Sequence, residues 1–334
     1  MAKAASRPNQ KTAASKPVTS QSNPVSGERS AVRELAKTAL KTNVGDRLPT
    51  ATVLKDSANV GSGTMQKAFQ ILEDLGALRT RARGHMGRFL EEKDLAQLWA
   101  LAGFPEIRAI LTPPGSPETY GLSEGLRQEF AKIGLPLDID YVLGARERAE
   151  LAIKSPFSLA FVSRGASMAL EALPQIWGRV MLGSGSYYSK DSIVVLSNKQ
   201  TDLGSKKLRI GVDRRSHDHK LLTTQRFGEL ETLKLVDVGF PDVPAALLRG
   251  DIDAGVWHRM LLVITPEIAG LRVSPLPKEA NRLLTDLGSA VALFDPGNSV
   301  MKSVVEAVSW ESVIRTQASW MKNFARNPAG PWFR

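Results

Sequence analysis

Apolar residues in the first quarter of the chain recur three or four positions apart, which is the period of an amphipathic helix. The pattern predicts helices over residues 30–42, 50–58 and 62–75. Two alternating runs then predict strands at 78–83 and 88–90, joined by a turn from Gly84 to Gly87. Three helices followed by a hairpin predict a winged helix-turn-helix over residues 28–91.

Beyond this segment the pattern changes to short apolar strands that alternate with helices. Residues 92–106 predict a linker helix. Strands are predicted at 107–111, 137–143, 158–162, 191–197, 208–212, 234–238, 252–257 and 289–294. Helices are predicted at 120–133, 145–154, 219–227, 243–249 and 300–324. This alternation is typical of parallel α/β architecture, and its two similar runs predict a two-lobed α/β domain over 107–334, with the second lobe at about 198–268.

The first 27 residues follow neither pattern. They are rich in Ala, Ser, Pro, Lys and Gln and hold too little apolar surface to offset the entropy lost on ordering, so we expect a disordered basic arm. The arm also lacks the apolar stretch of a signal peptide. The chain has no cysteine and no apolar run near the roughly 20 residues that span a bilayer. We therefore expect a cytoplasmic protein without disulfides, thiol catalysis or a membrane partner.

The distribution of charge points to a polyanionic partner. The formal net charge is +10. Residues 1–90 hold 15 Lys and Arg against 6 Asp and Glu, a surplus of +9, whereas the other residues hold 29 against 28, a surplus of +1. Positive charge gathered around a winged helix favours DNA binding, although a basic tail beside an unrelated domain would give the same numbers.

The candidate DNA contacts lie mainly on the third helix and the hairpin. A recognition helix presents short polar side chains at its N-terminal end to reach base edges, and arginines of a wing can grip phosphates or enter the minor groove. The candidates are Arg47, Thr50, Ser62, Gly63, Thr64, Gln66, Lys67, Gln70, Arg79, Arg81, Arg83, His85 and Arg88. They predict binding to double-stranded DNA, with a homodimer on a two-fold operator.

This segment resembles the winged helix-turn-helix of GntR-type transcription regulators. The resemblance rests on the run GDRLPT at 45–50 and on single positions that continue to the wing. These are Leu54, Val60, Thr64, Ala68, Leu72, Gly76, Gly84, Gly87 and Phe89. Over its whole length the chain resembles the YhfZ-type regulators, which implies a ligand-responsive regulator of transcription. It departs from the GntR pattern at Ser62 and Gln66, near which arginines are usual. Sequence reading would therefore be weaker, or would rest on Gln66 and Gln70 contacting adenines.

The α/β half resembles periplasmic binding proteins of type II, which hold a small ligand between two lobes. The run 247–255 is similar to a helix-to-strand return frequent in that class. Loops at the carboxyl ends of strands bind ligands in such folds, and four of them qualify here: 112–120, 163–167, 213–219 and 257–259. Candidate ligand-binding residues are Thr112, Ser116, Thr119, Tyr120, Ser163, Arg164, Arg214, Ser216, His217, Trp257 and His258. Because three of the four loops carry arginine, we expect a small anionic effector.

Other functions stay open on the sequence alone. His217, Asp218 and His219 could suggest a metal site, but neighbouring side chains at a helix start point in different directions, so we expect no metal. The chain has no Walker loop, G-x-S-x-G elbow or dinucleotide fingerprint, so we expect no enzyme and no cofactor. The alternatives are an enzyme or solute-binding protein with an accessory winged helix, a nonspecific nucleoid protein, and a winged helix that serves protein contacts.

Overall fold

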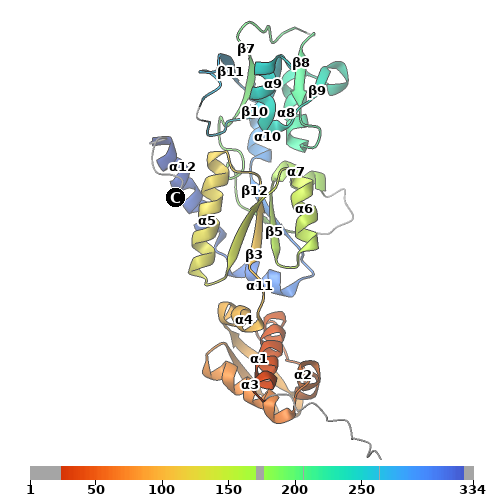
Figure 1. Ribbon diagram of the computed structural model, residues 1–334, viewed down its shortest axis with the longest axis vertical. Coiled ribbons are helices and arrows are strands. Elements are labelled where there is room, and N and C mark those ends of the chain that lie inside the picture. Colours follow the sequence, from red (N-terminus) through yellow and green to blue (C-terminus); the bar gives the residue numbers. More distant parts are fainter. Residues whose placement is uncertain (1–23, 171–176, 206, 263, 327–334) are drawn as a thin grey trace, which may run out of the picture.

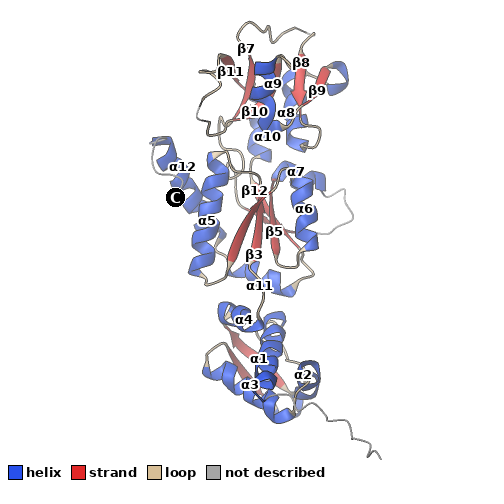
Figure 2. Cartoon of the chain, in the orientation of Figure 1, coloured by secondary structure: helices blue, strands red, loops and turns tan. Residues whose placement is uncertain are grey.

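The computed structural model describes residues 24–170, 177–205, 207–262 and 264–326. Three bodies follow one another along the long axis of the molecule, with a helical N-terminal domain at one end, an α/β lobe in the middle and a second α/β lobe at the other end (Figures 1 and 2). None of the helices in the described part of the chain combines the length and apolar character that a membrane span needs.

The N-terminal domain is a winged helix-turn-helix. Its elements are α1 (Pro24–Lys41), α2 (Ala51–Ala58), α3 (Ser62–Asp74), β1 (Leu78–Ala82), the 3-10 turn η1 (Gly84–Met86) and β2 (Arg88–Lys93). The Thr50 hydroxyl caps α2 by accepting the amide of Val53, and Asn59 ends that helix in the left-handed conformation. The apolar stripes of the predicted helices are buried between the helices except at Ala51 and Leu75, which are exposed. Strand β1 pairs antiparallel with β2 to form the wing.

The first lobe is a five-stranded sheet with helices on both faces. Its elements are β3 (Ile107–Leu111), α5 (Pro117–Lys132), β4 (Leu137–Tyr141), α6 (Ala145–Lys154), β5 (Ser158–Ser163), α7 (Arg164–Ala169), β6 (Gly178–Met181), β12 (Ala290–Phe294), α11 (Ser299–Ala307) and α12 (Trp310–Arg326). The strand order is β4-β3-β5-β12-β6, in which β3 is parallel to β4 and β5. Strand β12 runs antiparallel to β5 and β6. The three parallel strands therefore end at one edge of the sheet.

The second lobe repeats this plan with different residues. Its elements are β7 (Ile193–Asn198), β8 (Arg209–Val212), α8 (His217–Phe227), η3 (Leu230–Thr232), β9 (Lys234–Asp237), η4 (Phe240–Asp242), α9 (Val243–Arg249), β10 (Ala254–His258), β11 (Leu271–Pro275) and α10 (Lys278–Leu287). The order is β11-β7-β10-β8-β9, with β8 parallel to β9 and β10. Strand β7 runs antiparallel to both of its neighbours. The predicted two-lobed α/β domain is confirmed, and both sheets are mixed rather than wholly parallel.

Several boundaries differ from those expected. The arm was expected to reach residue 27, but α1 begins at Pro24, because proline is tolerated in the first turn of a helix; residues 1–23 lie outside the described part of the chain. The wing extends to Lys93, two residues past the expected boundary. The helix expected over 300–324 is two helices, α11 and α12, which meet at Val308 in an extended conformation.

The second lobe is longer than the expected 198–268. Its sheet takes in β7 and β11 and spans residues 193–275, and the lobe continues through α10 to Leu287. Strand β11 was not predicted, and it lies at the sheet edge, where its terminal Pro275 removes no needed ladder hydrogen bond. Strand β6 and helix α10 were also missed, although Ala280, Leu284 and Leu287 form a helical apolar stripe that could have revealed α10.

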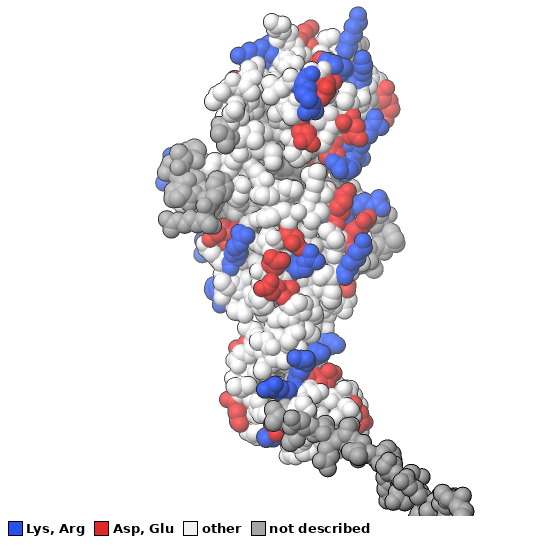
Figure 3. Space-filling model, viewed as in Figure 1, with Lys and Arg blue, Asp and Glu red and all other residues white. Residues whose placement is uncertain are grey.

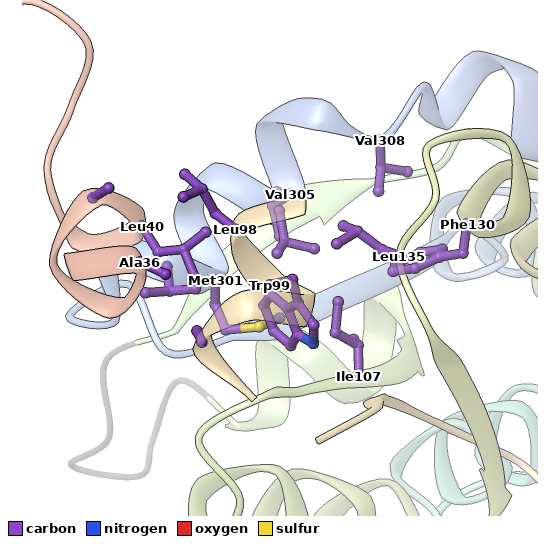
Figure 4. Close-up of a cluster of buried hydrophobic side chains, with 14 of the residues drawn as sticks. Ala36, Leu40, Leu98, Trp99, Ile107, Phe130, Leu135, Met301, Val305 and Val308 are labelled. Atoms are coloured by element: carbon purple, nitrogen blue, oxygen red, sulfur yellow. The ribbon is translucent and has the colours of Figure 1, made fainter. Parts of the chain in front are cut away.

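The linker is a short, half-buried helix, α4 (Leu95–Ala102), capped by the Asp94 carboxylate. One hydrophobic cluster runs from the N-terminal domain through α4 into the first lobe (Figure 4). Its members include Ala36 and Leu40 of α1, Leu98 and Trp99 of α4, Ile107 of β3, and Met301 and Val305 of α11. The winged domain and the first lobe therefore share a core.

Candidate functional site

The exposed face of α3 carries the predicted base-reading residues. Ser62, Gly63 and Gln66 are exposed, whereas Met65 and Phe69 on the opposite face are buried. Thr64 is half-buried at the first turn. The predicted N-terminal polar face of a recognition helix is therefore accessible to a DNA groove.

Two other predicted residues of α3 are held by acidic neighbours. Lys67 Nζ lies 2.6 Å from Glu28 Oε1 of α1, and the Gln70 amide donates to Asp74 Oδ1 over 2.7 Å. Both contacts are exposed, so DNA could displace them at modest cost. Gln66 has no such partner among the described residues, which makes it the most available long polar side chain of this face.

The arginines of the wing strands are paired within the domain. Arg79 binds Glu92 and lies 3.4 Å from Glu91, whereas Arg81 lies 3.9 Å from Glu91. The hydrogen bond and the negative charge of Glu92 raise the pKa of Arg79 above its ordinary value. Glu91 and Glu92 come directly after residues 1–90, over which the sequence showed its surplus of positive charge. These acids reduce the positive field that the wing strands present to phosphates.

Arg88 supports the domain, and the remaining basic residues gather near the wing tip. The Arg88 guanidinium stacks over Phe69 at 4.4 Å and donates to the Thr80 hydroxyl over 2.9 Å. Arg83 stacks over Phe89 at 4.6 Å, on the other side of the hairpin turn. His85 is exposed on the 3-10 turn, and Arg47 lies against Gly87. Arg47, Arg83 and His85 are thus better placed than Arg88 to meet a phosphate.

The winged domain itself is less basic than the first 90 residues suggest. Residues 24–93 hold 12 Lys and Arg against 8 Asp and Glu, a surplus of +4. The arm before residue 24 adds four Lys and Arg and no acid. In the face drawn in Figure 3, cationic and anionic side chains are intermingled over both lobes. The net positive charge is therefore divided between the winged domain and the arm.

A second site lies in the cleft between the two lobes, where the carboxyl ends of parallel strands from both sheets meet. Three small cavities lie there, with volumes of about 10, 60 and 70 Å³, and Thr112 lines each of them. Seven predicted residues line these cavities: Thr112, Ser116, Thr119, Ser163, Ser216, His217 and His258. All four predicted loops therefore contribute to one cleft.

Four predicted residues do not line the cleft. Trp257 is buried in the core of the second lobe, because the side chains of β10 alternate between the two faces of the sheet. Arg164 turns outward and donates to the carbonyl of Asp286, and Arg214 is exposed. Tyr120 stacks on Trp320 of α12 at 5.8 Å.

The sequence prediction also missed residues that do line the cleft. Those outside the predicted loops include Leu143, Gly144, Ala145, Arg148, Tyr187, Tyr188, Phe240, Pro241 and Met260. Glu118, Asp213, Arg215 and Asp218 lie in the predicted loops but were not among the named candidates. The rule used for the other loops could have found the turns after β4 and β9, since both follow parallel strands. Nothing local in the sequence marks Tyr187 and Tyr188, which lie where the chain crosses between the lobes.

Asp218 of α8 reaches from the second lobe to the first. Its Oδ2 accepts hydrogen bonds from the Ser163 hydroxyl, at the end of β5, and from the Tyr188 hydroxyl over 2.9 Å. The side chain is 3% exposed, and its Oδ1 has no hydrogen-bond partner. Burial raises the pKa of Asp218, and the two hydrogen bonds and Arg148 oppose that shift without cancelling it.

Glu118 of α5 makes a second contact between the lobes. Its Oε1 accepts the amide of Ser189 over 2.9 Å, and its Oε2 lies 3.3 Å from His258 Nε2 at the end of β10. Burial alone would raise the pKa of Glu118, but His258 and the hydrogen bonds from Ser189 lower it to about 2. Glu118 is therefore a carboxylate at neutral pH, fixed between the first lobe, the crossing segment and the second lobe.

Arg148 is a buried cation behind the cleft. Its guanidinium donates to the carbonyls of Phe161 and Val142, each over 2.8 Å, and to the Tyr187 hydroxyl over 3.0 Å. None of these three hydrogen bonds goes to a carboxylate. Arg215, by contrast, pairs with Asp213 at 3.3 Å on the second lobe. The cleft thus holds cationic and anionic groups in nearly equal measure.

His219 is fully engaged inside the second lobe. Its Nδ1 accepts the amide of Asp213 over 2.9 Å, and its Nε2 lies 3.0 Å from the carbonyl oxygen of Val256. This pattern assigns the proton to Nε2, and burial lowers the pKa of His219 to about 4. Both ring nitrogens are used, so His219 cannot join His217 and Asp218 as a metal ligand without breaking these bonds.

Comparison with known families matches both parts of the chain. A family model described as the YhfZ C-terminal domain matches residues 94–327, and one described as a helix-turn-helix domain matches residues 43–90. The protein YhfZ of Escherichia coli (strain K12) is 25% identical over 279 residues, which cover 82% of this chain and 89% of that protein.

Two solved structures are also similar in their α/β parts. The crystal structure of YhfZ from Shigella flexneri is 23% identical, covers 66% of this chain and 97% of its own, and has a TM-score of 0.44. The periplasmic aliphatic sulphonate binding protein SsuA from Escherichia coli is 15% identical, covers 67% and 75% respectively, and has a TM-score of 0.46.

Proposed function

Because the chain belongs to the family defined by the YhfZ C-terminal domain, we propose that it is a transcription regulator whose winged helix binds operator DNA and whose interlobe cleft binds a small effector. The observation that carries this proposal is the exposed polar face of α3 within a helix-turn-helix domain that shares its core with the first lobe. A regulator requires a DNA-binding surface joined mechanically to a ligand site, and the core shared by the winged domain and the first lobe supports such a connection.

Gln66 is the residue to which we assign base recognition. A glutamine amide can pair with both N6 and N7 of adenine in the major groove, whereas Ser62 and Gly63 allow the backbone of α3 to come close to the bases. Arg47, Arg83 and His85 would contact phosphates on either side of the wing. Such contacts supply affinity without sequence information.

The direct test selects binding sites from random duplexes with the full chain and measures affinity by fluorescence anisotropy. Gln66→Ala should weaken binding to the selected site about tenfold or more, because a bidentate base contact contributes roughly 1–3 kcal/mol. Gln128→Ala, an exposed glutamine on α5, is the matched control and should bind like the wild type. Failure to enrich any sequence, with weak binding to all duplexes at low salt, would contradict the proposal.

The same measurement separates the regulator from a nonspecific nucleoid protein. A nonspecific protein would bind selected and random duplexes with the same affinity and the same salt dependence. A regulator should prefer the selected site by about a thousandfold at physiological salt.

We propose that the protein binds as a homodimer in the cytoplasm, so sedimentation of the complex should give two chains per duplex.

We propose that the effector is a small anion. The proposal is supported by the N-termini of α6 and α8, which face the cleft from opposite lobes, and by the Arg215 guanidinium between them. Thermal unfolding of the full chain with a panel of carboxylates and phosphates tests it, because a ligand that binds the native state raises its melting temperature. Stabilisation by cations or neutral molecules alone would refute the anionic class. Turnover of any of these compounds would favour an enzyme instead.

A further inference from the structure

The two lobes meet through a carboxylate of the chain itself. Asp218 stands in the first turn of α8 in the second lobe, and the Ser163 hydroxyl that donates to it ends a strand of the first lobe. Tyr188, which donates to the same oxygen, belongs to the segment that crosses between the lobes. One carboxylate oxygen therefore ties together the first lobe, the second lobe and the crossing segment.

The close approach at this point depends on a glycine. Gly165 lies in the first turn of α7, and a Cβ atom placed there would overlap Asp218 Oδ1 and lie 2.7 Å from the Leu287 side chain of α10. Its backbone φ is not in the left-handed region, so glycine is not required there by the backbone. The absence of a side chain at Gly165 lets α8 and α10 of the second lobe rest on α7 of the first.

Further contacts hold the lobes together on the other side of the cleft. His258 lies 3.3 Å from Glu118, and the amide of Leu261 donates to the carbonyl of Gly115 over 2.6 Å. The ring of Tyr188 packs edge-on against His258 at 5.3 Å and so connects the two sets of contacts. All of these groups belong to the chain itself.

We propose that Asp218 acts as a built-in carboxylate ligand of the cleft, which latches the lobes together through Ser163 and Tyr188, and that the acidic group of the effector competes with it and releases the latch. The inference rests on the proposed effector site in the cleft. Each hydroxyl has a single proton to donate, so Ser163 and Tyr188 cannot serve Asp218 and a second oxyanion at once. A buried carboxylate also repels another anion placed beside it. Effector binding therefore separates the lobes instead of closing them.

The test measures the distance between the lobes in the full chain. The chain contains no cysteine, so Ile153→Cys on α6 and Leu248→Cys on α9, whose side chains are 49% and 58% exposed, provide a unique pair of spin-label sites. Double electron–electron resonance should give a single, narrow distance distribution in the otherwise unchanged protein. Gly165→Ala, which inserts a methyl group into the latch, should shift the distribution to longer distances. Gly27→Ala, whose new methyl meets only ordinary packing, should not.

Inorganic phosphate is the probe for the competition. It should lengthen the interlobe distance in the wild type, and Asp218→Asn should bind phosphate about tenfold more tightly, because the competing charge is gone. Asp286→Asn, at an exposed position of the same junction, should bind phosphate like the wild type. Tighter phosphate binding would be measured by titration calorimetry.

Three results would overturn the proposal. They are a folded Gly165→Ala protein that keeps the wild-type distance, phosphate binding that shortens the distance, and an Asp218→Asn protein whose phosphate binding is unchanged, weaker or undetectable. Circular dichroism establishes that each variant is folded. DNA binding is measured separately by anisotropy, so a chain that opens as expected but binds no operator would refute the proposed regulator and leave the latch standing.

Discussion

The molecule has two junctions of opposite character. The winged domain meets the first lobe through an apolar core, in which Trp99 and Leu98 are fully buried against α1 and α11 (Figure 4). The first lobe meets the second largely through polar contacts, centred on Asp218 and Glu118. Among the described residues, two chain segments cross between the lobes, one before β7 and one after α10.

This difference shows which part of the molecule can move. Separating an apolar core exposes hydrophobic surface to water, which costs about 25 cal/mol for each Å². Separating polar groups lets water replace the lost hydrogen bonds, so the net cost of each is only about 1 kcal/mol. The winged domain should therefore move with the first lobe as one body, while the second lobe rotates about the crossing segments.

The largest expected effect comes from opening the apolar junction. Trp99→Ala removes a fully buried ring that packs edge-on against Phe104 and Phe157 and donates to the Pro105 carbonyl. It should lower the free energy of unfolding by about 3–5 kcal/mol and split the urea transition into two, because the winged domain loses its shared core. Leu248→Ala, an exposed residue of α9, should leave the transition unchanged. A single transition at the wild-type midpoint would contradict the shared-core junction.

The second lobe should respond to acid through His219, which is buried inside that lobe. Burial lowers the pKa of His219 from its usual value near 6.5 to about 4. Between pH 6.5 and pH 4, the unfolded chain therefore binds a proton that the folded chain does not. Stability from this group is complete above pH 6.5 and should fall by about 3 kcal/mol by pH 4. In urea unfolding, the His219→Gln protein should lack this loss of stability between pH 6.5 and pH 4. Trp99→Ala should retain the wild-type dependence, and equal slopes for His219→Gln and the wild type would be inconsistent with a neutral buried ring.

A smaller effect is expected at the second contact between the lobes. Glu118→Gln keeps an oxygen for the Ser189 amide but loses the charge that faces His258. Unfolding free energy at pH 7 should fall by about 1–2 kcal/mol. Glu311→Gln, whose ion pair with Arg315 is exposed on α12, should change it by less than about 0.5 kcal/mol. Equal effects of the two substitutions would remove Glu118 from the junction.

The smallest effect concerns a polar contact within the apolar junction. Lys93 Nζ donates to the carbonyls of Leu40 and Thr42 and to the Ser303 hydroxyl of α11, and burial lowers the pKa of its ammonium group. Lys93→Met should lower the free energy of unfolding by about 1 kcal/mol, measured by thermal unfolding. The two carbonyls lose their donor, but the methionine side chain packs in the surrounding core and limits the loss. A loss as large as that of Trp99→Ala would show that this junction, too, depends on polar contacts.

Much of the fold could be predicted because its signals are local. Helix periodicity located α2 and α3 within one residue at each end, and strand ends located seven residues of the cleft. The sequence could not predict the contacts of side chains whose partners lie far away along the chain. Arg88, a predicted DNA contact, stacks on Phe69 and donates to Thr80, and Arg164 turns outward toward α10, more than 100 residues away.

The sequence by itself determined that a winged helix precedes two α/β lobes, because side-chain periods of 3.6 and 2 residues report which face each element buries. The tertiary structure alone decided which charges remain available. Acids at Glu73, Glu91 and Glu92 take up wing arginines, and Asp218 crosses the cleft to Ser163, 55 positions earlier in the chain. Such pairings depend on how separate elements pack, and no local pattern of hydrophobic and polar residues encodes the partner of a charge.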